Sequence, residues 1–523
     1  MDSAPTLDLA SFLQAASEFA SYPGAVNDAA AKEFLNRFPL PVLFGVLQME
    51  VDVPKLEDTT VACLNRILRT GYGSSLLLQY IVFLQAGLRA SSESIRCLAC
   101  KSVYYILENN EDKEAAAKII IEHDICPLLI HCLLDGNEGT FSASMSAIQS
   151  IAKSAEGINA IFPSGSEDPL ELKNIAGHCS SLARIRILAL IKELFSLSEN
   201  VASLIYSSNL LKLFEVEING RSDMLTILSA LEILYELAES PHSAKFLLKT
   251  SLLQLLTVMI SNDTVDSILR SRAMLISGRL LSTPAALKAI DPSRINALLL
   301  TIDGRLNLVE SQSLDEVENA VEAVGRVGSS ADGAALLLTS LSLMVKHVVE
   351  LAFDRQGRGK QLAALHTLGS IAGADRSNES VLLNKSAEEC LKRMIYEAAV
   401  SSPKLTPSGL FLSILQQEPE MRLAAYRLIT VLSARKWCLM ELCSKLEITS
   451  IVMDANIEDT KMGMEARHRC CAAIYHSLSA SNMITDAKVA NLAEQLQEAV
   501  KRGPYQVKKR IEAQPIVITA DRF

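Results

Sequence analysis

Two cysteines, Cys97 and Cys100, stand three positions apart in an arrangement that could bind zinc. A structural zinc site needs a second pair of thiolate or imidazole ligands at a similar spacing. The nearest candidate ligands are His123, Cys126, His131 and Cys132. They fall within the helices expected to follow, without the turn that such sites use. We therefore expect Cys97 and Cys100 to be small buried residues and the chain to use no metal or other cofactor.

Two basic segments could bind anions. Residues 357–360 read Gly-Arg-Gly-Lys, but no Ser or Thr follows the lysine and no strand is expected before the segment, as a phosphate-binding loop requires. We expect residues 353–360 to form an exposed basic connector. The residues Lys461, Arg467, His468 and Arg469 are expected to form a solvated helix face, with contact to an acidic partner as the alternative.

Motifs of catalysis are missing from the sequence. It contains no nucleophile elbow, no HExxH and no dinucleotide-binding fingerprint. Together with the helical repeats described next, this favours a binding scaffold over an enzyme. We expect a protein without catalytic residues.

The pattern that does recur is an alanine followed by apolar residues at positions +1, +4 and +7. One copy reads Ala230, Leu231, Leu234 and Leu237. Full copies begin at Ala99, Ala230, Ala320, Ala364 and Ala425, and partial copies at Ala147, Ala189, Ala273 and Ala473. Successive alanines lie 41 to 48 residues apart, except for one interval of 61. Periods of about 40 to 47 residues are typical of armadillo and HEAT arrays.

The repeats predict an all-α fold, an armadillo/HEAT-like solenoid that forms a single curved superhelix. One repeat cannot bury its own apolar face, so neighbouring repeats must stack. We expect about nine units over residues 91–500, with an insertion near 400–420. Residues 1–90 are expected to form an irregular N-terminal helical cap, and residues 501–523 an extended tail. Three helices per unit favour the armadillo type.

The composition fits stacked helices, since 49% of the residues are hydrophobic but only 5% are aromatic. The formal charge of −10 argues against binding nucleic acid or an anionic membrane surface. The eleven cysteines are scattered, and we expect no secretory signal and no membrane-spanning stretch. We therefore expect a reduced cytoplasmic protein, with a nuclear location left open.

Each long helix has a second readable face opposite the buried stripe. Counted from the alanine, positions +2, +6 and +9 point away from the core at 100° per residue. These positions hold Gln149, Lys153, Glu156, Glu232, Glu236, Glu239, Glu322, Arg326, His366 and Arg427. In an armadillo stack the long third helix lines the concave groove. We expect these residues to contact a partner protein there.

The last hundred residues resemble a known family. The segment 419–437 contains Pro-Glu, then Ala-Ala-Tyr, and ends at the single tryptophan, Trp437. The ending Gly503-Pro504-Tyr505-x-Val507-Lys508 is similar to that family's Gly-Pro-Tyr-aromatic-Val-Lys, with Gln506 in the aromatic position and further basic residues after it. The family is that of the 26S proteasome non-ATPase regulatory subunit 5.

The resemblance implies a non-enzymatic chaperone for assembly of the proteasome regulatory-particle base. Such a chaperone binds the C-terminal domain of an ATPase subunit in its groove and leaves before the mature particle forms; we expect a monomer on its own. The alternatives are other armadillo-type scaffolds: a transport adaptor, a phosphatase scaffold or a ubiquitin-ligase adaptor. A transport adaptor would carry a ladder of Trp and Asn along its groove, and the single tryptophan of this chain argues against that class. A ubiquitin ligase of the RING type would need more zinc ligands than Cys63 in the first ninety residues.

Overall fold

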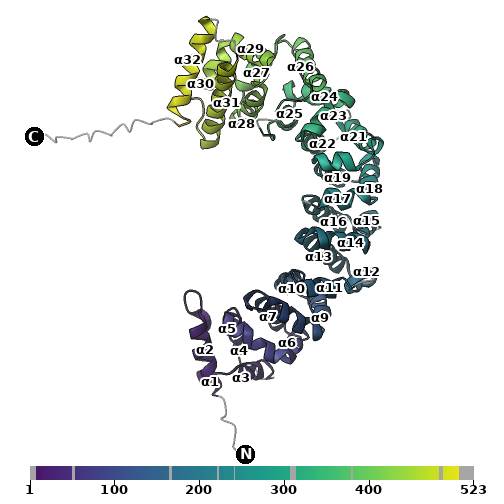
Figure 1. Cartoon of the computed structure of the whole chain (residues 1–523), viewed down its shortest axis with the longest axis vertical. Coiled ribbons are helices and arrows are strands. Elements are labelled where there is room, and N and C mark those ends of the chain that lie inside the picture. Colours follow the sequence, from purple (N-terminus) through teal and green to yellow (C-terminus); the bar gives the residue numbers. More distant parts are fainter. Residues whose placement is uncertain are drawn as a thin grey trace, which may run out of the picture. The chain divides into compact units, whose positions relative to one another are not determined.

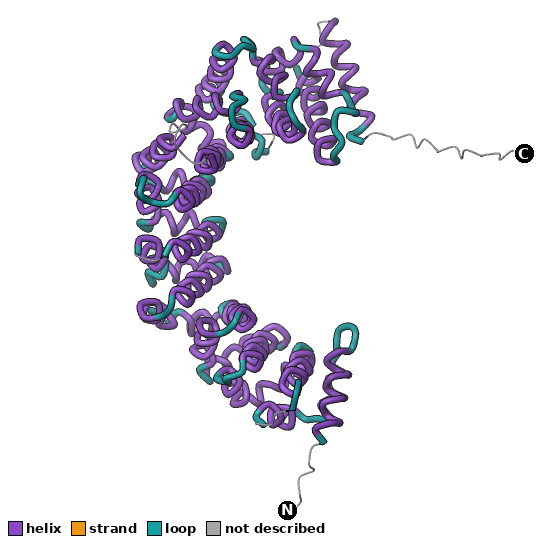
Figure 2. The backbone as a smooth tube through the Cα atoms, turned by 180° about the vertical axis from the view of Figure 1, so that it is seen from behind, coloured by secondary structure: helices purple, strands orange, loops and turns teal. Residues whose placement is uncertain are grey.

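The computed structural model describes residues 8–49, 53–163, 168–220, 223–240, 242–306, 314–377, 381–481 and 487–505. All regular secondary structure in these ranges is helical (Figure 2). The chain divides into two compact units, Met1–Leu252 and Leu253–Phe523. The expected all-α class is confirmed.

Unit 1 holds the helices up to α17. Their bounds are α1 Leu9–Ser21, α2 Asp28–Arg37, α3 Leu40–Leu47, α4 Leu56–Leu68, α5 Gly71–Leu77, η1 Leu78–Tyr80, α6 Ile81–Leu88, α7 Glu93–Asn109, α8 Lys113–Glu122, α9 Ile125–Asp135, α10 Glu138–Ile151, α11 Ala155–Ile161, η2 Pro169–Glu171, α12 Leu172–His178, α13 Ser181–Leu197, α14 Glu199–Ser207, α15 Lys212–Asn219, α16 Met224–Leu237, α17 Ser243–Phe246 and η3 Leu247–Lys249.

Unit 2 follows, with α18 beginning at the boundary. The bounds are α18 Leu252–Ser261, α19 Ser267–Leu280, α20 Pro284–Ala289, α21 Pro292–Leu306, α22 Leu314–Gly328, α23 Ala331–Ser340, α24 Ser342–Phe353, α25 Arg358–Ala372, α26 Lys385–Val400, α27 Pro407–Leu415, α28 Pro419–Leu432, α29 Lys436–Ser444, α30 Leu446–Met453, α31 Lys461–Ala480 and α32 Ala487–Arg502.

The long third helix of each repeat packs against the long helix of the next. In unit 1 this series runs through α4, α7, α10, α13 and α16, and in unit 2 through α19, α22, α25, α28 and α31. Figure 1 shows α19 and α22 on one side of unit 2, with α18 and α21 on the other. Sequential stacking of this kind confirms an armadillo/HEAT-like α-solenoid. Whether the whole chain forms one continuous curved superhelix stays a prediction.

The buried stripe of the long helices lies where the alanine pattern predicts. Ala230, Leu231, Leu234 and Leu237 are all 0% exposed. The helices approach closely, since a Cβ atom added to Gly278 would lie 2.6 Å from the backbone oxygen of Ala323 on the next long helix. Each buried leucine contributes roughly 1.5–3 kcal/mol of transfer free energy. The stack therefore derives its stability from contacts between successive repeats.

Two of the partial copies were assigned the wrong register. Ala189 and Ala473 are both partly exposed. In α13 the buried stripe starts two residues earlier, at Ile187, and in α31 it starts at Cys470. Alanine alone does not fix the phase of a helix, because a larger apolar residue can occupy the same buried position where the neighbouring helix leaves more room.

An arginine three residues before the stripe marks the register more reliably. It stands at Arg96, Arg184, Arg270, Arg422 and Arg467. In three repeats it forms an ion pair with a glutamate 33 to 46 residues further along the chain. These pairs are Arg184–Glu217, Arg270–Glu316 and Arg422–Glu458, with shortest N–O distances of 2.8, 2.8 and 2.6 Å. Each of these three arginines also donates to the carbonyl oxygen five residues before it.

The Arg270–Glu316 pair joins α19 to α22 inside the core. The side chains are 8% and 1% exposed, and the two groups form two parallel N–H···O bonds of 2.9 and 2.8 Å. Such bidentate pairs fix geometry as well as charge. The three pairs connect α13 to α15, α19 to α22, and α28 to the segment between α30 and α31.

The basic connector predicted at residues 353–360 is partly helix. The long helix α25 begins at Arg358, and Lys360 is buried. Arg358 forms ion pairs of 2.6 and 2.7 Å with Glu418 and Glu420. The prediction of an exposed loop is therefore wrong for its second half, because these ion pairs and packing hold the first turn of the helix in place.

The predicted basic helix face around Arg467 is only partly exposed to solvent. Arg467 is buried and donates to the backbone oxygens of Val452, at 2.8 Å, and Pro504, at 3.3 Å. Its neighbour His468 bonds to the oxygen of Val500 at 3.1 Å. These two residues hold α32 and the end of the described chain, and only Arg469 and Lys461 remain exposed. The predicted tail, from residue 506 on, lies outside the described residues.

Among the helices that the structure describes, no single one is long and apolar enough to cross a membrane. Two pairs of consecutive helices, each bent at the junction, reach the required length and apolar composition only when the two helices are taken together.

Candidate functional site

The predicted partner-binding residues lie on or beside the long helices, on the side away from the buried stripe. Gln149 belongs to α10, with Lys153 in the turn after it, and Glu232 and Glu236 belong to α16. In unit 2, Glu322 and Arg326 lie on α22, His366 on α25 and Arg427 on α28. The other two predicted residues lie outside the long helices, Glu156 on α11 and Glu239 in the turn after α16, and all ten side chains are exposed or half-buried.

In unit 1 these residues are joined by polar contacts from one repeat to the next. Gln149 Nε2 donates to Glu193 Oε2 at 2.7 Å, which connects α10 to α13. Lys192 Nζ lies 2.5 Å from Glu193 Oε1 and 2.8 Å from Glu236 Oε2, which connects α13 to α16. We name Gln149, Lys192, Glu193 and Glu236 the unit 1 ladder. Its charges have both signs and are paired along the stack.

A further pair extends this face to α7. Lys153 Nζ lies 2.6 Å from Glu108 Oε1, and Ser150 Oγ donates to the same oxygen at 2.8 Å. The hydrogen bond from Lys153 lowers the pKa of Glu108 to about 2, with a smaller contribution from Ser150 against the opposing effect of burial. Glu108 is therefore ionised at neutral pH and holds Lys153 in position.

Sequence reasoning missed Glu108, Lys192 and Glu193. Glu193 was missed because the stripe of α13 was counted from Ala189 rather than from Ile187, whereas Lys192 falls at position +5, outside the three positions that were counted. With the register taken from Arg184, Glu193 falls at position +6, the position that Lys153, Glu236 and Arg326 occupy in their own repeats. The arginine marker is the signal that would have found it.

In unit 2, Arg427 connects two long helices. Its Nη2 lies 2.6 Å from Asp375 Oδ1 and 3.1 Å from Ser370 Oγ, and its Nη1 donates to the backbone oxygen of His366 at 2.7 Å. Burial opposes ionisation of Asp375, but hydrogen bonds from Ser370 and Arg427 outweigh it and lower the pKa of this carboxyl. We name Arg326, His366, Asp375 and Arg427 the unit 2 cluster.

The other two members of the cluster, Arg326 and His366, interact with it through charge. Arg326 forms an ion pair of 3.2 Å with Glu322 one turn earlier, and its charge also stabilises the Asp375 carboxylate. The pKa of His366 is lowered by burial and by the charge of Arg427. The imidazole is therefore neutral at pH 7 and can both donate and accept a hydrogen bond.

A cavity of about 290 Å³ opens beside this cluster, between α25, α28 and α31. Its walls are formed by His366, Ala374, Leu423, Arg427, Thr430, Val431, Met462, Glu465, Ala466 and Arg469. Two predicted partner-binding residues, His366 and Arg427, therefore line the same cavity. Arginines beside apolar side chains are typical of protein-binding hot spots.

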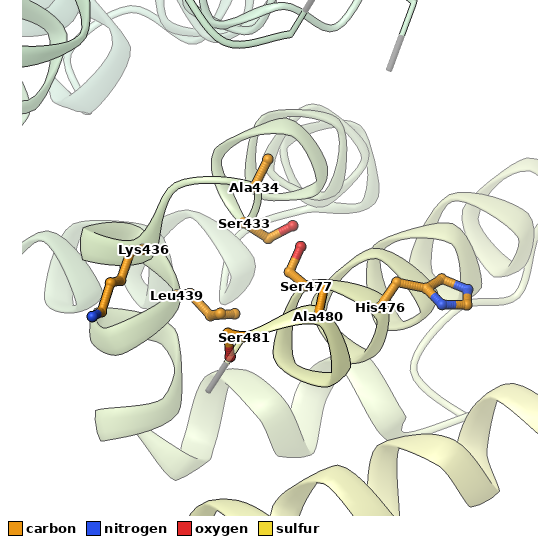
Figure 3. A pocket seen from close by; sticks show the side chains of 8 residues that line it. All are labelled: Ser433, Ala434, Lys436, Leu439, His476, Ser477, Ala480 and Ser481. Carbon is orange, nitrogen blue, oxygen red and sulfur yellow. The ribbon is translucent and has the colours of Figure 1, made fainter. Parts of the chain in front are cut away.

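A larger cavity of about 590 Å³ lies among α28, α29 and α31. Figure 3 shows the hydroxyls of Ser433 and Ser477 facing one another, whereas Lys436 and His476 point to opposite sides. The imidazole is therefore not placed to activate either hydroxyl as a general base, which would require hydrogen-bond distance. This cavity has no catalytic arrangement among its labelled residues.

No three His, Cys, Asp or Glu side chains within the described ranges converge as metal ligands would. Of the C-x-x-C pair, Cys100 is buried and Cys97 partly exposed. Burial also raises the pKa of Cys63 to about 12 and of Cys126 to about 11. These two thiols are protonated at neutral pH, whereas the nucleophilic form of cysteine is the thiolate.

Comparison with known proteins assigns the chain to a family. The family described as "Proteasome non-ATPase 26S subunit" matches residues 25–518. The chain is 22% identical to the 26S proteasome non-ATPase regulatory subunit 5 of Bos taurus and of Homo sapiens, over 86% of each chain. A solved engineered protein aligns with 80% of this chain and 98% of its own, at 16% identity and a TM-score of 0.42. On the match over residues 25–518, the chain belongs to the proteasome non-ATPase 26S subunit family.

Proposed function

We propose that this protein is a non-enzymatic chaperone for assembly of the base of the 26S proteasome regulatory particle. It binds the C-terminal domain of one proteasomal ATPase subunit through the polar face of its long helices. It holds an assembly intermediate and leaves before the mature particle forms. This places its work in the cytoplasm, with the nucleus as a second compartment, and makes it a monomer when no partner is bound.

The observation that carries the proposal is the ordered polar face on a chain of this family. In the unit 1 ladder, Lys192 is held between Glu193 and Glu236, so its position is fixed before a partner arrives. Pre-organised charges of both signs contribute specificity and association rate rather than raw affinity. A folded domain with a mixed-charge surface fits such a face better than a uniformly charged partner such as nucleic acid.

The non-enzymatic part of the proposal is supported by the chemistry of the two cavities and the thiols. In the cavity beside the unit 2 cluster, the one hydroxyl among the lining residues, that of Thr430, donates to the backbone oxygen of Tyr426 at 2.6 Å. A protein-binding surface does not need a side chain that acts as a nucleophile or a base. The polar side chains beside the two cavities can then contact a partner protein.

The test is a binding measurement with purified components. The full-length chain is titrated by calorimetry with the isolated C-terminal domain of each proteasomal ATPase subunit from the same organism. We expect one domain to bind, and the chain to co-purify from cells with that subunit but not with mature 26S particles. Binding to none of the domains, or stoichiometric recovery in mature particles, would contradict the proposal.

A further inference from the structure

The cavity between α25, α28 and α31 contains two guanidinium groups in different states. Arg427 is occupied, since its Nη atoms bond to the oxygens of His366, Ser370 and Asp375. Arg469 lines the same cavity, is exposed, and has no hydrogen-bond or ion-pair partner among the described residues. A guanidinium offers five N–H donors in a planar fork that matches a carboxylate. Arg469 therefore presents an unused anion-binding group.

The acidic groups beside the cavity are already engaged. Glu465 accepts a hydrogen bond from the hydroxyl of Tyr505 and lies 3.9 Å from Lys461 Nζ. Asp375 is held by Arg427 at 2.6 Å. Each of these carboxylates contacts another group, and among the described residues neither forms an ion pair with Arg469.

Apart from His366 and Thr430, the remaining walls of the cavity are apolar. Leu423 and Val431 of α28 are half-buried, and Met462 of α31 is 66% exposed. An unbranched thioether side chain adapts readily to the shape of an incoming group. The volume of about 290 Å³ lies at the lower limit of small-molecule pockets, so it suits one or two side chains of a protein partner.

We infer that this cavity anchors the partner protein by taking one of its acidic side chains, with the carboxylate on Arg469 and an adjacent apolar side chain against Leu423, Val431 and Met462. The inference rests on the proposed function, in which the same face binds an ATPase domain. It adds the chemistry of the contact, which is an Asp or Glu next to an aliphatic residue on the surface of the partner.

The first test uses the ATPase domain that binds the wild-type chain. Arg469→Glu should weaken binding by about tenfold or more, because the introduced carboxylate repels the carboxylate of the partner. Arg469→Lys should have an intermediate effect, because lysine keeps the positive charge but cannot form the bidentate contact. The matched control is Arg294→Glu, the same charge change at an exposed position on α21. An Asp→Lys or Glu→Lys variant of the domain should restore binding to Arg469→Glu. Unchanged binding of Arg469→Glu overturns the inference while the proposed function stands.

A second test does not depend on the ATPase. The full-length chain with isotope-labelled methionine methyl groups is titrated with a capped peptide that has one glutamate between two leucines, and with its glutamine counterpart. The signal of Met462, assigned by Met462→Leu, should shift with the glutamate peptide and much less with the glutamine peptide. Equal responses overturn the inference, even if an ATPase domain binds elsewhere. A shift that appears only after removal of residues 506–523 also overturns it, because the chain's own tail would then be the occupant.

Discussion

Glu108 accepts hydrogen bonds from Lys153 and Ser150, and its pKa is lowered to about 2. A carboxyl whose pKa is lower in the folded state contributes stability above its ordinary pKa of about 4.5. That contribution is lost as pH falls from about 4.5 through about 2. Protonation of Glu108 at low pH is therefore expected to weaken its contact with Lys153 and so to loosen this part of the polar face.

We predict that Glu108→Gln removes part of the acid sensitivity of unit 1. The free energy of unfolding of the wild type should fall more steeply between about pH 4.5 and about pH 2 than that of the variant, because only the wild type takes up a proton at this site. Denaturant unfolding at several pH values measures the difference. The exposed Glu122→Gln is the control, and identical pH profiles for wild type and Glu108→Gln would contradict the prediction.

A second prediction at this scale concerns metal. The purified protein should contain no stoichiometric zinc and should keep free thiols, because Cys100 is buried and no ligand set converges around it in the described part of the chain. Elemental analysis and thiol titration in denaturant check this. About one zinc per chain, removed by Cys97→Ser together with Cys100→Ser, would show that these two cysteines belong to a zinc site.

At the scale of the element, the phase of each long helix is set by which residues reach the neighbouring helix. The structure places Ile187 in the core and leaves Ala189 partly exposed. Ile187→Ala should therefore lower the free energy of unfolding by about 2–5 kcal/mol, whereas Ala189→Ser should change it by about 0.5 kcal/mol or less. Chemical denaturation of the full chain measures both. A larger effect of Ala189→Ser than of Ile187→Ala would restore the register that the alanine pattern predicts.

The arginine–glutamate pairs give a second prediction for the elements. Glu316→Ala leaves the Arg270 guanidinium buried without its partner and should cost about 3–5 kcal/mol. The double variant Arg270→Met with Glu316→Leu should recover much of that loss, because it removes the guanidinium that lost its partner. Arg305, whose Nε lies 4.0 Å from Glu316 Oε1, keeps its ion pair with Asp263 at 2.6 Å in both variants. Thermal unfolding compares the two variants. If both lose the same stability, the pair is not the reason that α19 and α22 hold together.

At the scale of the whole molecule, the sequence predicts the helical solenoid because every repeat must bury the same stripe against its neighbour. The repeat period and the apolar stripe around Ala230 can both be identified from the positions of residues in the sequence. The pairs such as Arg270–Glu316 could not be predicted in that way, since their members lie 46 residues apart and meet only after stacking. A misplaced register hid Glu193, because it shifts every position counted along the helix.

The polar faces show what sequence alone leaves open about the candidate site. The pattern identifies Glu236 and Arg427 as facing away from the core, and the structure confirms that both are accessible on the long helices. It does not reveal that each is paired within the chain, to Lys192 and to Asp375. Reversing Glu236 alone would therefore place two lysines together, so a change in binding could follow from lost order rather than from a lost contact.

The most direct test of the central claim exchanges the charges of Lys192 and Glu236 while keeping them paired. Lys192→Glu combined with Glu236→Lys retains opposite charges at 192 and 236 but exchanges the charges that a partner meets. Glu193→Gln is included because Glu193 lies 2.5 Å from Lys192 and would otherwise face a like charge. The melting temperature should stay within a few degrees of the wild type, while affinity for the ATPase C-terminal domain, measured by calorimetry, should fall by about tenfold or more. A swapped chain that keeps its fold and binds the domain as tightly as the wild type would contradict the assignment of this face as the binding surface.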